Sequence, residues 1–198
     1  MPVSRSGDGY HKGNLDAVLE EAALELLAEE GTSALSLRAV ARRAGVSHNA
    51  PYHHFGDRQG LLKSVAARGL RALLDVMVTA RQSESAPRAR LLAAGFAYVD
   101  FAREHRPLFD IIFDPDICDP REPNAITGPL VEANDRFLAE TVAAALPPNT
   151  AEDLVRATIG AVWAAVHGMA VLVASHHLEP GVVRPGLTAL LDVQFADS

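Results

Sequence analysis

The sequence predicts an all-α fold, with a small N-terminal helical domain followed by a larger C-terminal helical bundle. Runs of Ala and Leu dominate the chain, and apolar residues recur at spacings of three and four, which is typical of amphipathic helices. No stretch alternates apolar and β-branched residues in the way that a strand would. With 198 residues, 48% of them hydrophobic, the chain is large enough to bury a core, and a disordered chain is therefore not expected.

The start of the first helix is predicted from the glycine-rich segment before it and from the first periodic pattern of apolar residues. Residues 1–13 contain three glycines and no apolar periodicity, which predicts a flexible tail. The first helix is expected to be capped by Asn14 and ended by Gly31. One face of it would be apolar, formed by Leu15, Val18, Leu19, Ala22 and Leu26. We divide the chain into this tail, an N-terminal domain of residues 14–60 and a C-terminal domain of residues 61–198.

Two short helices are expected next. Ser36 can cap a helix over residues 37–44 that ends at Gly45, and Ser47 can then cap a third helix. Pro51 would lie in the first turn of that helix, where a missing amide hydrogen costs least.

The remaining elements are longer helices separated by prolines and polar segments. A helix capped by Asp57 is expected to continue to about Gln82, and a further helix over residues 88–105 would be ended by Pro107. Four prolines predict a loop over residues 114–129. Helices follow over about 130–145 and 151–177, with a last short helix ending near Phe195.

The charges are distributed unevenly. The chain carries a net charge of −7, which by itself argues against a nucleic-acid partner because affinity for phosphate comes mostly from Lys and Arg. By segment, however, residues 1–35 carry −5, residues 36–71 carry +6 and residues 72–198 carry −8. A basic segment inside an acidic chain is typical of a DNA-binding module. The alternative is a solvated surface that happens to be basic.

The link between the two short helices predicts a helix-turn-helix. Its sequence is Ala-Gly-Val-Ser, in which Gly45 permits the tight turn and Val46 fills the space between the helices. The second short helix would then be the recognition helix, with polar and aromatic side chains suited to base edges and phosphates: Ser47, His48, Asn49, Tyr52, His53 and His54. Phe55 is expected to be a packing residue. For Tyr52, packing and DNA contact remain equal alternatives.

Residues 14–62 resemble the N-terminal domain of the TetR-type transcriptional regulators. The resemblance lies in SLRAVARRAGVSHNAPYHHFGDRQGLL, within which AGVS, the Tyr52-x-x-Phe55 pair and the following Leu-Leu match the family pattern. The resemblance implies that Arg38 and Arg58 are phosphate or base contacts flanking the recognition helix. It also implies groove contacts by His48, Asn49, Tyr52 and His53. The chain departs from the family at Arg58, where lysine is usual, and at Gly60, where a larger helix former is usual.

The C-terminal part resembles the regulatory domain of a TetR subgroup named for a Trp-His-Gly motif. The similar stretches are FAREHRPLFDIIFDPDI and AVWAAVHGMAVLV, and Trp163, His167 and Gly168 supply the motif. The resemblance implies a homodimer formed through the last two helices. It also implies a repressor that a small molecule releases from a palindromic DNA site. In this hypothesis the ligand shifts the long helix that begins near Asp57 and so changes the spacing of the two recognition helices.

A ligand cavity in the C-terminal bundle is expected among its large apolar side chains. Trp163 and His167 lie one turn apart and are candidate ligand contacts, although such a histidine is often a satisfied core group. The other candidates are Phe96, Phe101, Phe109, Ile112, Phe113 and Met169, for which plain core packing is the alternative. An acidic run near the expected cavity is either a solvated loop or a site for a cationic ligand; it contains Asp110, Asp114, Asp116, Asp119 and Glu122.

Other classes of protein find little support in the sequence. Residues 157–178 carry no formal charge, but polar histidines and the lack of basic flanks favour a helix buried by the core and by a partner subunit over a membrane span. No motif of a di-iron, zinc-protease or esterase site is present, so we expect no enzyme, metal or cofactor. The single cysteine, Cys118, and the lack of a leader sequence favour a cytoplasmic protein. The alternative function is a ligand-binding or catalytic bundle in which the helix-turn-helix is only structural.

Overall fold

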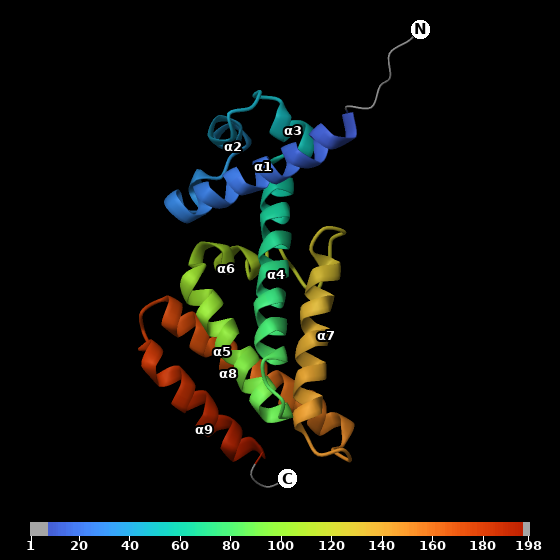
Figure 1. Ribbon diagram of the computed structural model, residues 1–198, viewed down its shortest axis with the longest axis vertical. Helices are drawn as coiled ribbons and strands as arrows, with labels where there is room; N and C mark the ends of the chain where they lie inside the picture. The colour runs from blue at the N-terminus through green and yellow to red at the C-terminus, as the bar shows by residue number, and fades with distance from the viewer. Residues whose placement is uncertain (1–7, 196–198) are drawn as a thin grey trace.

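The computed structural model describes the backbone of residues 8–195 and the side chains of residues 15–192, and within these ranges it contains helices and no strand. Figure 1 shows a small N-terminal unit at one end, from which a central helix runs into the larger C-terminal bundle. The elements are α1 (Asp8–Glu30), η1 (Thr32–Ala34), α2 (Leu37–Ala44), α3 (Ala50–Phe55), α4 (Arg58–Gln82), α5 (Pro87–Glu104), α6 (Arg106–Ile112), α7 (Gly128–Ala145), α8 (Glu152–Ala174), η2 (Pro180–Val182) and α9 (Val183–Phe195). The all-α prediction is confirmed.

The turn between α2 and α3 forms as the sequence predicts. The Ser36 side chain accepts a hydrogen bond from the amide of Ala39 at 3.2 Å and caps α2. Gly45 then adopts the left-handed conformation, with φ 66° and ψ 27°. The amides of Gly45 and Val46 donate to the carbonyls of Arg42 and Ala41, which is the Schellman arrangement that ends a helix. The chain therefore reverses within a few residues and places α3 beside α2.

Two predicted helix starts differ from the structure. Residues 8–13, assigned to a flexible tail, belong to α1, and Asn14 lies inside that helix. Each glycine there costs about 1 kcal/mol, but no proline interrupts the segment, and adding residues to a formed helix is easier than starting one. Residues 1–7 of the expected tail lie outside the described residues. The helix expected from Ser47 begins at Ala50, because the Ala50 amide donates to the Ser47 carbonyl at 3.0 Å and closes a turn first.

Pro107 also acts differently from the prediction. We expected it to end the preceding helix, but α5 ends at Glu104 and Pro107 lies in the first turn of a new short helix, α6. A first turn tolerates proline because its amides have no partner within the helix. The sequence reasoning had predicted no helix over Arg106–Ile112.

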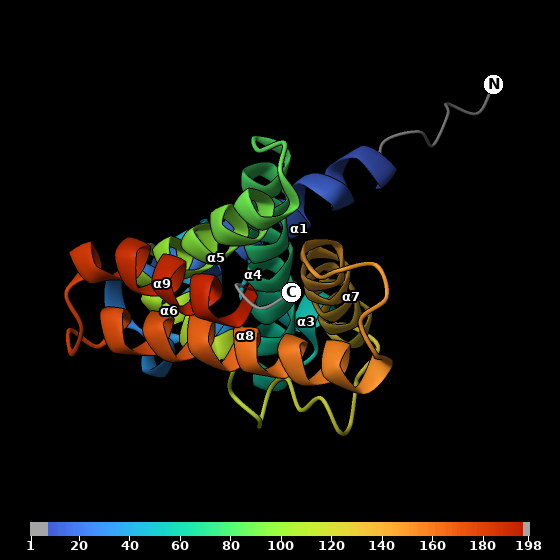
Figure 2. The same cartoon turned by 90° about the horizontal axis from the view of Figure 1, so that it is seen from below.

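Helix α4 connects the two parts of the chain. The Asp57 side chain accepts from the Gly60 amide at 2.8 Å and caps its start, as predicted, and the helix continues unbroken to Gln82. In Figures 1 and 2 it begins among α1–α3 and runs between α5 and α7, with α8 and α9 farther out. Leu61 and Leu62 belong to the same apolar cluster as Leu73 and Met77 farther along α4. The expected domain boundary at residues 60–61 therefore falls inside one continuous helix.

The crossing of α4 and α6 depends on a glycine. A Cβ atom added at Gly69 would lie 2.8 Å from the side chain of Ile112 and 2.9 Å from that of Leu108. Such distances are shorter than carbon atoms tolerate, so the absence of a side chain lets α6 lie directly against α4. This contact positions Ile112, which borders the cavity described below.

We expect Gly69→Ala to destabilise the fold by about 1–3 kcal/mol, because the added methyl group must displace α6 from α4. Urea denaturation followed by circular dichroism measures this. Gly160→Ala on α8 is the matched control, since a Cβ atom there meets nothing within 4 Å. Its effect should be neutral or stabilising by up to about 1 kcal/mol from helix propensity. A stabilising effect of Gly69→Ala would show that the crossing is not tight.

Candidate functional site

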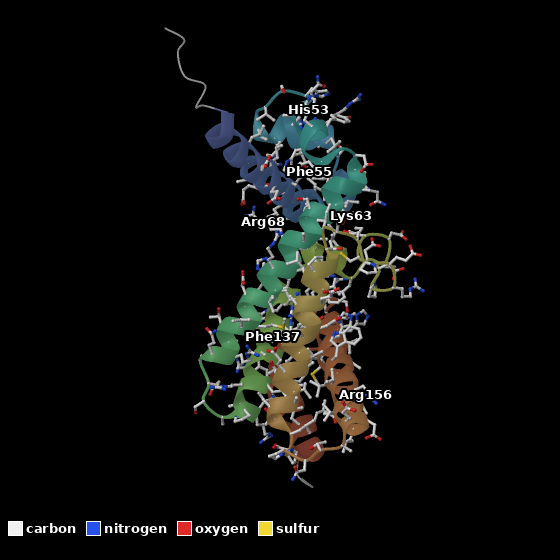
Figure 3. The ribbon with its side chains drawn as sticks, turned by 90° about the vertical axis from the view of Figure 1, so that its right-hand side faces the viewer. His53, Phe55, Lys63, Arg68, Phe137 and Arg156 are labelled. Carbon is white, nitrogen blue, oxygen red and sulfur yellow. The ribbon has the colours of Figure 1, made fainter. Side chains whose placement is uncertain are left out.

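The start of α3 and the turn before it form an exposed polar surface. Ser47, His48, Asn49 and His53 are exposed, and 44% of the Tyr52 surface is accessible. Figure 3 shows His53 at the outer end of the molecule, with Phe55 behind it. Phe55 is buried and Val46 packs against the core, as expected for packing residues. Tyr52 therefore lies on the surface and not in the core.

His54 faces a different direction from the other predicted contacts. Its Nδ1 lies 2.8 Å from Oδ1 of Asp16 on α1, and its ring meets that of Phe55 edge to face at 4.3 Å. The His54 side chain is half-buried in this contact. It therefore links α3 to α1 and does not face outward with Tyr52. Sequence reasoning grouped it with its neighbours because it could not see the partner on α1.

Of the two arginines predicted to contact DNA, Arg58 forms hydrogen bonds within the described part of the protein and Arg38 does not. The guanidinium of Arg58 donates from Nε to the Leu35 carbonyl at 3.0 Å and from Nη2 to the Thr32 carbonyl at 3.1 Å. Arg58 therefore stabilises the segment between α1 and α2, whether or not it also contacts DNA. Arg38, by contrast, is exposed on α2 and has no hydrogen bond or ion pair among the described residues. Arg42, one turn later, is exposed as well; sequence reasoning missed it, although its i,i+4 spacing from Arg38 was a usable signal.

Acidic side chains of α1 pair with part of the basic segment. Arg43 lies within 3.6 Å of three glutamates of α1, the nearest being Glu29 at 2.7 Å. Arg68 lies 3.4 Å from Glu20 and 2.9 Å from Glu21. Because Arg43 and Arg68 are paired, the charge of +6 on residues 36–71 overstates the positive charge that a binding partner would meet. Arg38 and Arg42 of α2 are exposed and unpaired among the described residues, and they supply much of the positive charge that remains.

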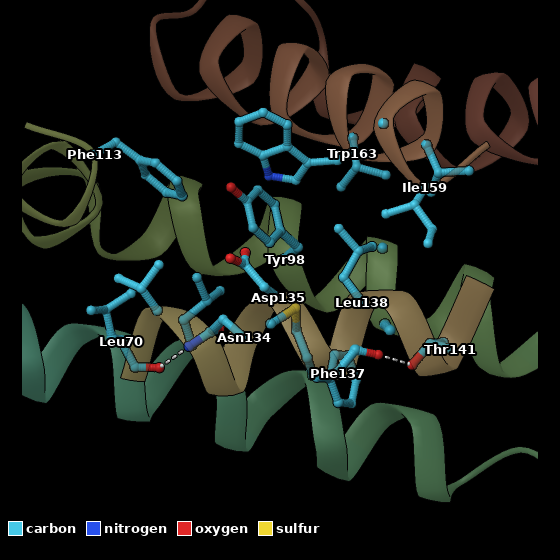
Figure 4. Close-up of a pocket in the computed structure, with 18 of the residues that line it drawn as sticks. Leu70, Tyr98, Phe113, Asn134, Asp135, Phe137, Leu138, Thr141, Ile159 and Trp163 are labelled. Carbon is cyan, nitrogen blue, oxygen red and sulfur yellow. Dashed lines mark hydrogen bonds between the residues drawn. The ribbon is translucent and has the colours of Figure 1, made fainter. Parts of the chain in front are cut away.

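A cavity of about 550 Å³ lies among α4, α5, α7 and α8. Its walls are mostly aliphatic and aromatic, and Figure 4 shows Tyr98, Asp135 and Trp163 around it. Volumes of this size suit small-molecule ligands. Three of the predicted ligand contacts border it, namely Ile112, Phe113 and Trp163.

The other five predicted contacts lie outside the cavity lining. Phe109 and His167 lie behind the lining residue Phe113. The centroids of their rings are 4.8 Å and 4.6 Å, respectively, from the centroid of the Phe113 ring. Phe101 is buried, with its ring 5.0 Å from that of His105. The Arg184 guanidinium covers Phe96 at 4.4 Å, and Met169 approaches Gly186 between α8 and α9. Helical geometry explains Phe96, which projects from the side of α5 roughly opposite to Tyr98, a residue that does line the cavity. Phe101 lies one turn beyond Tyr98, at the end of α5, where its ring packs against His105.

Tyr98 and His167 form a neutral pair at the cavity wall. The Tyr98 hydroxyl lies 2.8 Å from Nδ1 of His167. Burial raises the pKa of Tyr98, with an opposing contribution from the Trp163 side chain, and burial lowers the pKa of His167. The His167 ring also stacks on Trp163 at 5.5 Å. This arrangement fixes the Tyr98 hydroxyl and the indole without placing a charge in the wall.

Two polar residues of α7 line the cavity and were missed in the sequence. The Asn134 Nδ2 donates to the carbonyls of Leu130 at 2.9 Å and Leu70 at 3.3 Å, which leaves its Oδ1 buried without a partner among the described residues. Burial raises the pKa of Asp135, and nearby Glu132 raises it further. An Asn-Asp pair within a helix otherwise apolar on that side was the available signal.

The acidic run after α6 is a solvated loop over much of its length. The Asp114 carboxylate accepts from the Asp116 amide at 2.9 Å, and Asp119 pairs with Arg121, which lowers the pKa of Asp119 to about 2. From this loop Cys118 and two prolines, not these acids, line the cavity.

Burial raises the pKa of the Cys118 thiol, which disfavours a reactive thiolate. The described residues contain no cluster of three His, Cys, Asp or Glu side chains suited to a metal ion.

Helix α8 is long and apolar enough to cross a membrane by length and composition alone, properties that it shares with core helices of soluble proteins. Here Val162, Val166, Ala170 and Val173 of α8 are buried within the bundle.

Comparison with known proteins relates both parts of the chain to one family. Residues 19–65 match the family model described as "Bacterial regulatory proteins, tetR family", and residues 91–197 match "Tetracyclin repressor-like, C-terminal domain". A solved structure of a protein of unknown function from Rhodococcus sp. RHA1 is 34% identical, with 94% of this chain and 96% of that chain covered and a TM-score of 0.74. A putative transcriptional regulator from Pseudomonas aeruginosa PAO1 shares the fold at 17% identity, with coverage of 92% and 91% and a TM-score of 0.71.

Curated relatives match over a shorter region. The HTH-type transcriptional regulator YobS of Bacillus subtilis is 34% identical over 96 residues, which is 47% of this chain and 48% of that protein. The regulator BetI of Burkholderia thailandensis is 38% identical over 93 residues, with 46% and 48% covered. The chain thus spans about half the length of the curated relatives it matches.

The different environments of Arg58 and Arg38 predict different effects on stability. Arg58→Ala should lower the free energy of unfolding by about 1–3 kcal/mol, because two hydrogen bonds to backbone carbonyls are lost. Arg38→Ala, the matched control, should change it by less than about 0.5 kcal/mol, as expected for an exposed side chain without partners. Urea denaturation of both variants measures the difference. Equal effects would contradict the structural role assigned to Arg58.

Proposed function

Because the chain belongs to the TetR family of bacterial regulatory proteins, we propose that it is a homodimeric repressor that a small molecule releases from a palindromic operator. The observation that carries this proposal is the exposed polar surface of α3, linked by the continuous helix α4 to an apolar cavity. The protein would act on double-stranded DNA in the cytoplasm and would require no cofactor or metal for that role.

The DNA contacts are proposed from exposure and position. Arg38 and Arg42 are placed to neutralise phosphates beside the groove, while α3 enters the major groove. The side chains proposed to reach bases and nearby phosphates are Ser47, His48, Asn49, Tyr52 and His53. His54 and Arg58 would support this surface through their contacts with α1 and with the segment before α2.

The proposed dimer uses an apolar side of α8 together with α9. Leu154 and Leu172 are exposed, and because they are 18 residues apart they project in the same direction from α8. Leu190 of α9 is exposed too. Trp163 projects from the opposite side of α8, so a partner on the leucine side leaves the cavity lining at Trp163 clear. A twofold dimer would present two α3 helices, which must lie about 34 Å apart to read successive major grooves.

The proposed release of DNA depends on α4. Leu70, Leu73 and Met77 of this helix line the cavity, while Leu61 and Leu62 are buried near its start. A ligand that fits the cavity best when α4 is displaced would favour a dimer whose α3 helices no longer match the operator spacing. Such coupling requires only that the ligand binds the two arrangements with different affinities.

Fluorescence anisotropy with a labelled fragment of the region upstream of the protein's own gene tests the proposal. Binding should weaken steeply with rising salt, and Tyr52→Ala or Arg38→Ala should raise the Kd about tenfold. Arg38→Ala should also reduce the salt dependence by about one released ion, because it removes a phosphate contact. The matched control is Arg136→Ala, an exposed arginine of α7 without an ion pair among the described residues.

Salt-insensitive binding, or binding unchanged by Tyr52→Ala and Arg38→Ala, would overturn the assignment of this surface. The absence of any DNA binding together with ligand turnover would favour the alternative, a ligand-binding or catalytic bundle with a structural helix-turn-helix.

Sedimentation velocity tests the proposed dimer. The chain has a mass of 21.1 kDa, so the native protein should sediment at about twice that mass. Leu172→Glu should yield monomers, because it buries an unpaired charge in the proposed interface. Val76→Glu is the control, since Val76 is also an exposed apolar residue but lies on α4. A native monomer, or a Leu172→Glu dimer as stable as the native one, would contradict the interface.

A further inference from the structure

Some hydrogen-bonding groups of the cavity lining already have partners within the described part of the chain, and others do not. Two strong donors in the lining already have partners: Asn134 Nδ2 donates to two carbonyls, and the Thr141 hydroxyl donates to the Phe137 carbonyl at 2.6 Å. The Tyr98 hydroxyl is paired with His167, and the Trp163 side chain interacts with Tyr98. The lining therefore offers a ligand few free donors.

Two side-chain acceptors of the lining, on Asn134 and Asp135, are unused within residues 15–192. Asn134 Oδ1 is buried and has no partner among the described residues. The Asp135 carboxylate points from α7 into the cavity in Figure 4 and forms no hydrogen bond or ion pair there. No Lys, Arg or His belongs to the described lining. An anionic ligand would meet a carboxylate and no free cation, whereas a cationic ligand with N–H donors would satisfy Asp135.

Aromatic rings surround the same part of the cavity. Phe113, Tyr98 and Trp163 all contribute to the lining, and 37% of Phe113 and 46% of Trp163 remain accessible, which places them with exposed Asp135 at the cavity mouth. Aromatic faces attract cations as well as apolar groups. Farther inside, Leu70, Leu73 and Val166 offer only apolar surface. The cavity thus combines an apolar interior with an acidic and aromatic mouth.

We propose that the cavity selects an apolar molecule carrying a protonated amine, with Asp135 as the residue that recognises the ammonium group. The apolar body would occupy the space between α4 and α8. The inference rests on the proposed function only in taking this cavity as the effector site. Asp135 is partly desolvated at the cavity mouth, which raises its pKa, and a bound cation would replace the part of its hydration that the carboxylate has lost.

Three probes with the same alkyl chain test this selectivity: 1-decylamine and decanoate, each below its micellar concentration, and 1-decanol below its solubility limit. Trp163 is the only tryptophan of the chain and lines the cavity, so its fluorescence reports occupancy in the intact protein. Decylamine should bind about tenfold more tightly than decanol, and decanoate more weakly than either. Isothermal titration calorimetry should give one site per chain.

Two variants separate recognition by Asp135 from general attraction to an acidic protein. Asp135→Asn keeps the shape of the side chain and should abolish the preference for decylamine over decanol. Glu132→Gln, the matched control, removes the same charge from the exposed side of α7 outside the lining and should preserve the preference. Circular dichroism should show both variants folded. Decanoate binding as tight as decylamine, or a preference unchanged in Asp135→Asn, would overturn the inference.

Adding the operator fragment separates this inference from the proposed function. Selective binding of decylamine that leaves the DNA complex intact would support the amine selectivity and overturn the proposed release. Release of DNA by decanoate but not by decylamine would overturn the amine selectivity and support the regulator.

Discussion

The unbroken course of α4 is the constraint on which the rest of the structure depends. The 25 residues of α4 extend about 37 Å, and about 24 Å of this length separates the buried Leu61 near its start from Met77 in the cavity wall. A helix transmits displacement because its hydrogen bonds resist bending, so a shift at one end must be accommodated at the other. Gly69 strengthens the connection by letting α6, which carries the cavity residue Ile112, lie directly against the helix.

The electrostatics follow from how α1 lies across the N-terminal unit. Its acidic residues pair with Arg43 and Arg68 and contact His54, so part of the negative charge of the first 35 residues and two of the seven cations of the next 36 neutralise each other within the fold. The arginines of α2 are left exposed beside α3. The acidic C-terminal bundle adds repulsion from DNA, which favours an approach through the N-terminal end.

The sequence predicted what local rules determine and missed what depends on packing between helices. Ser36, Gly45 and Asp57 mark their helix ends because capping involves neighbours three or four residues away. His54 and Arg58 were assigned to DNA contact because their partners lie 38 and 23 or more residues away, beyond any local pattern. Three of the eight predicted cavity contacts border the cavity, since apolar composition identifies candidates but the face each one occupies depends on how α5 and α8 cross. Asn134 and Asp135 were missed because a polar pair on a helix ordinarily faces solvent.

Reciprocal binding measurements test whether the cavity is coupled to α3. The affinity of whichever decyl probe binds is determined from Trp163 fluorescence with and without saturating operator DNA, and the affinity for DNA is determined with and without the saturating probe. The account predicts that each ligand weakens the other by the same factor, of about 5-fold or more, since linkage is reciprocal. Probe affinity that is unchanged on DNA, together with DNA affinity that is unchanged by the probe, would contradict coupling through α4.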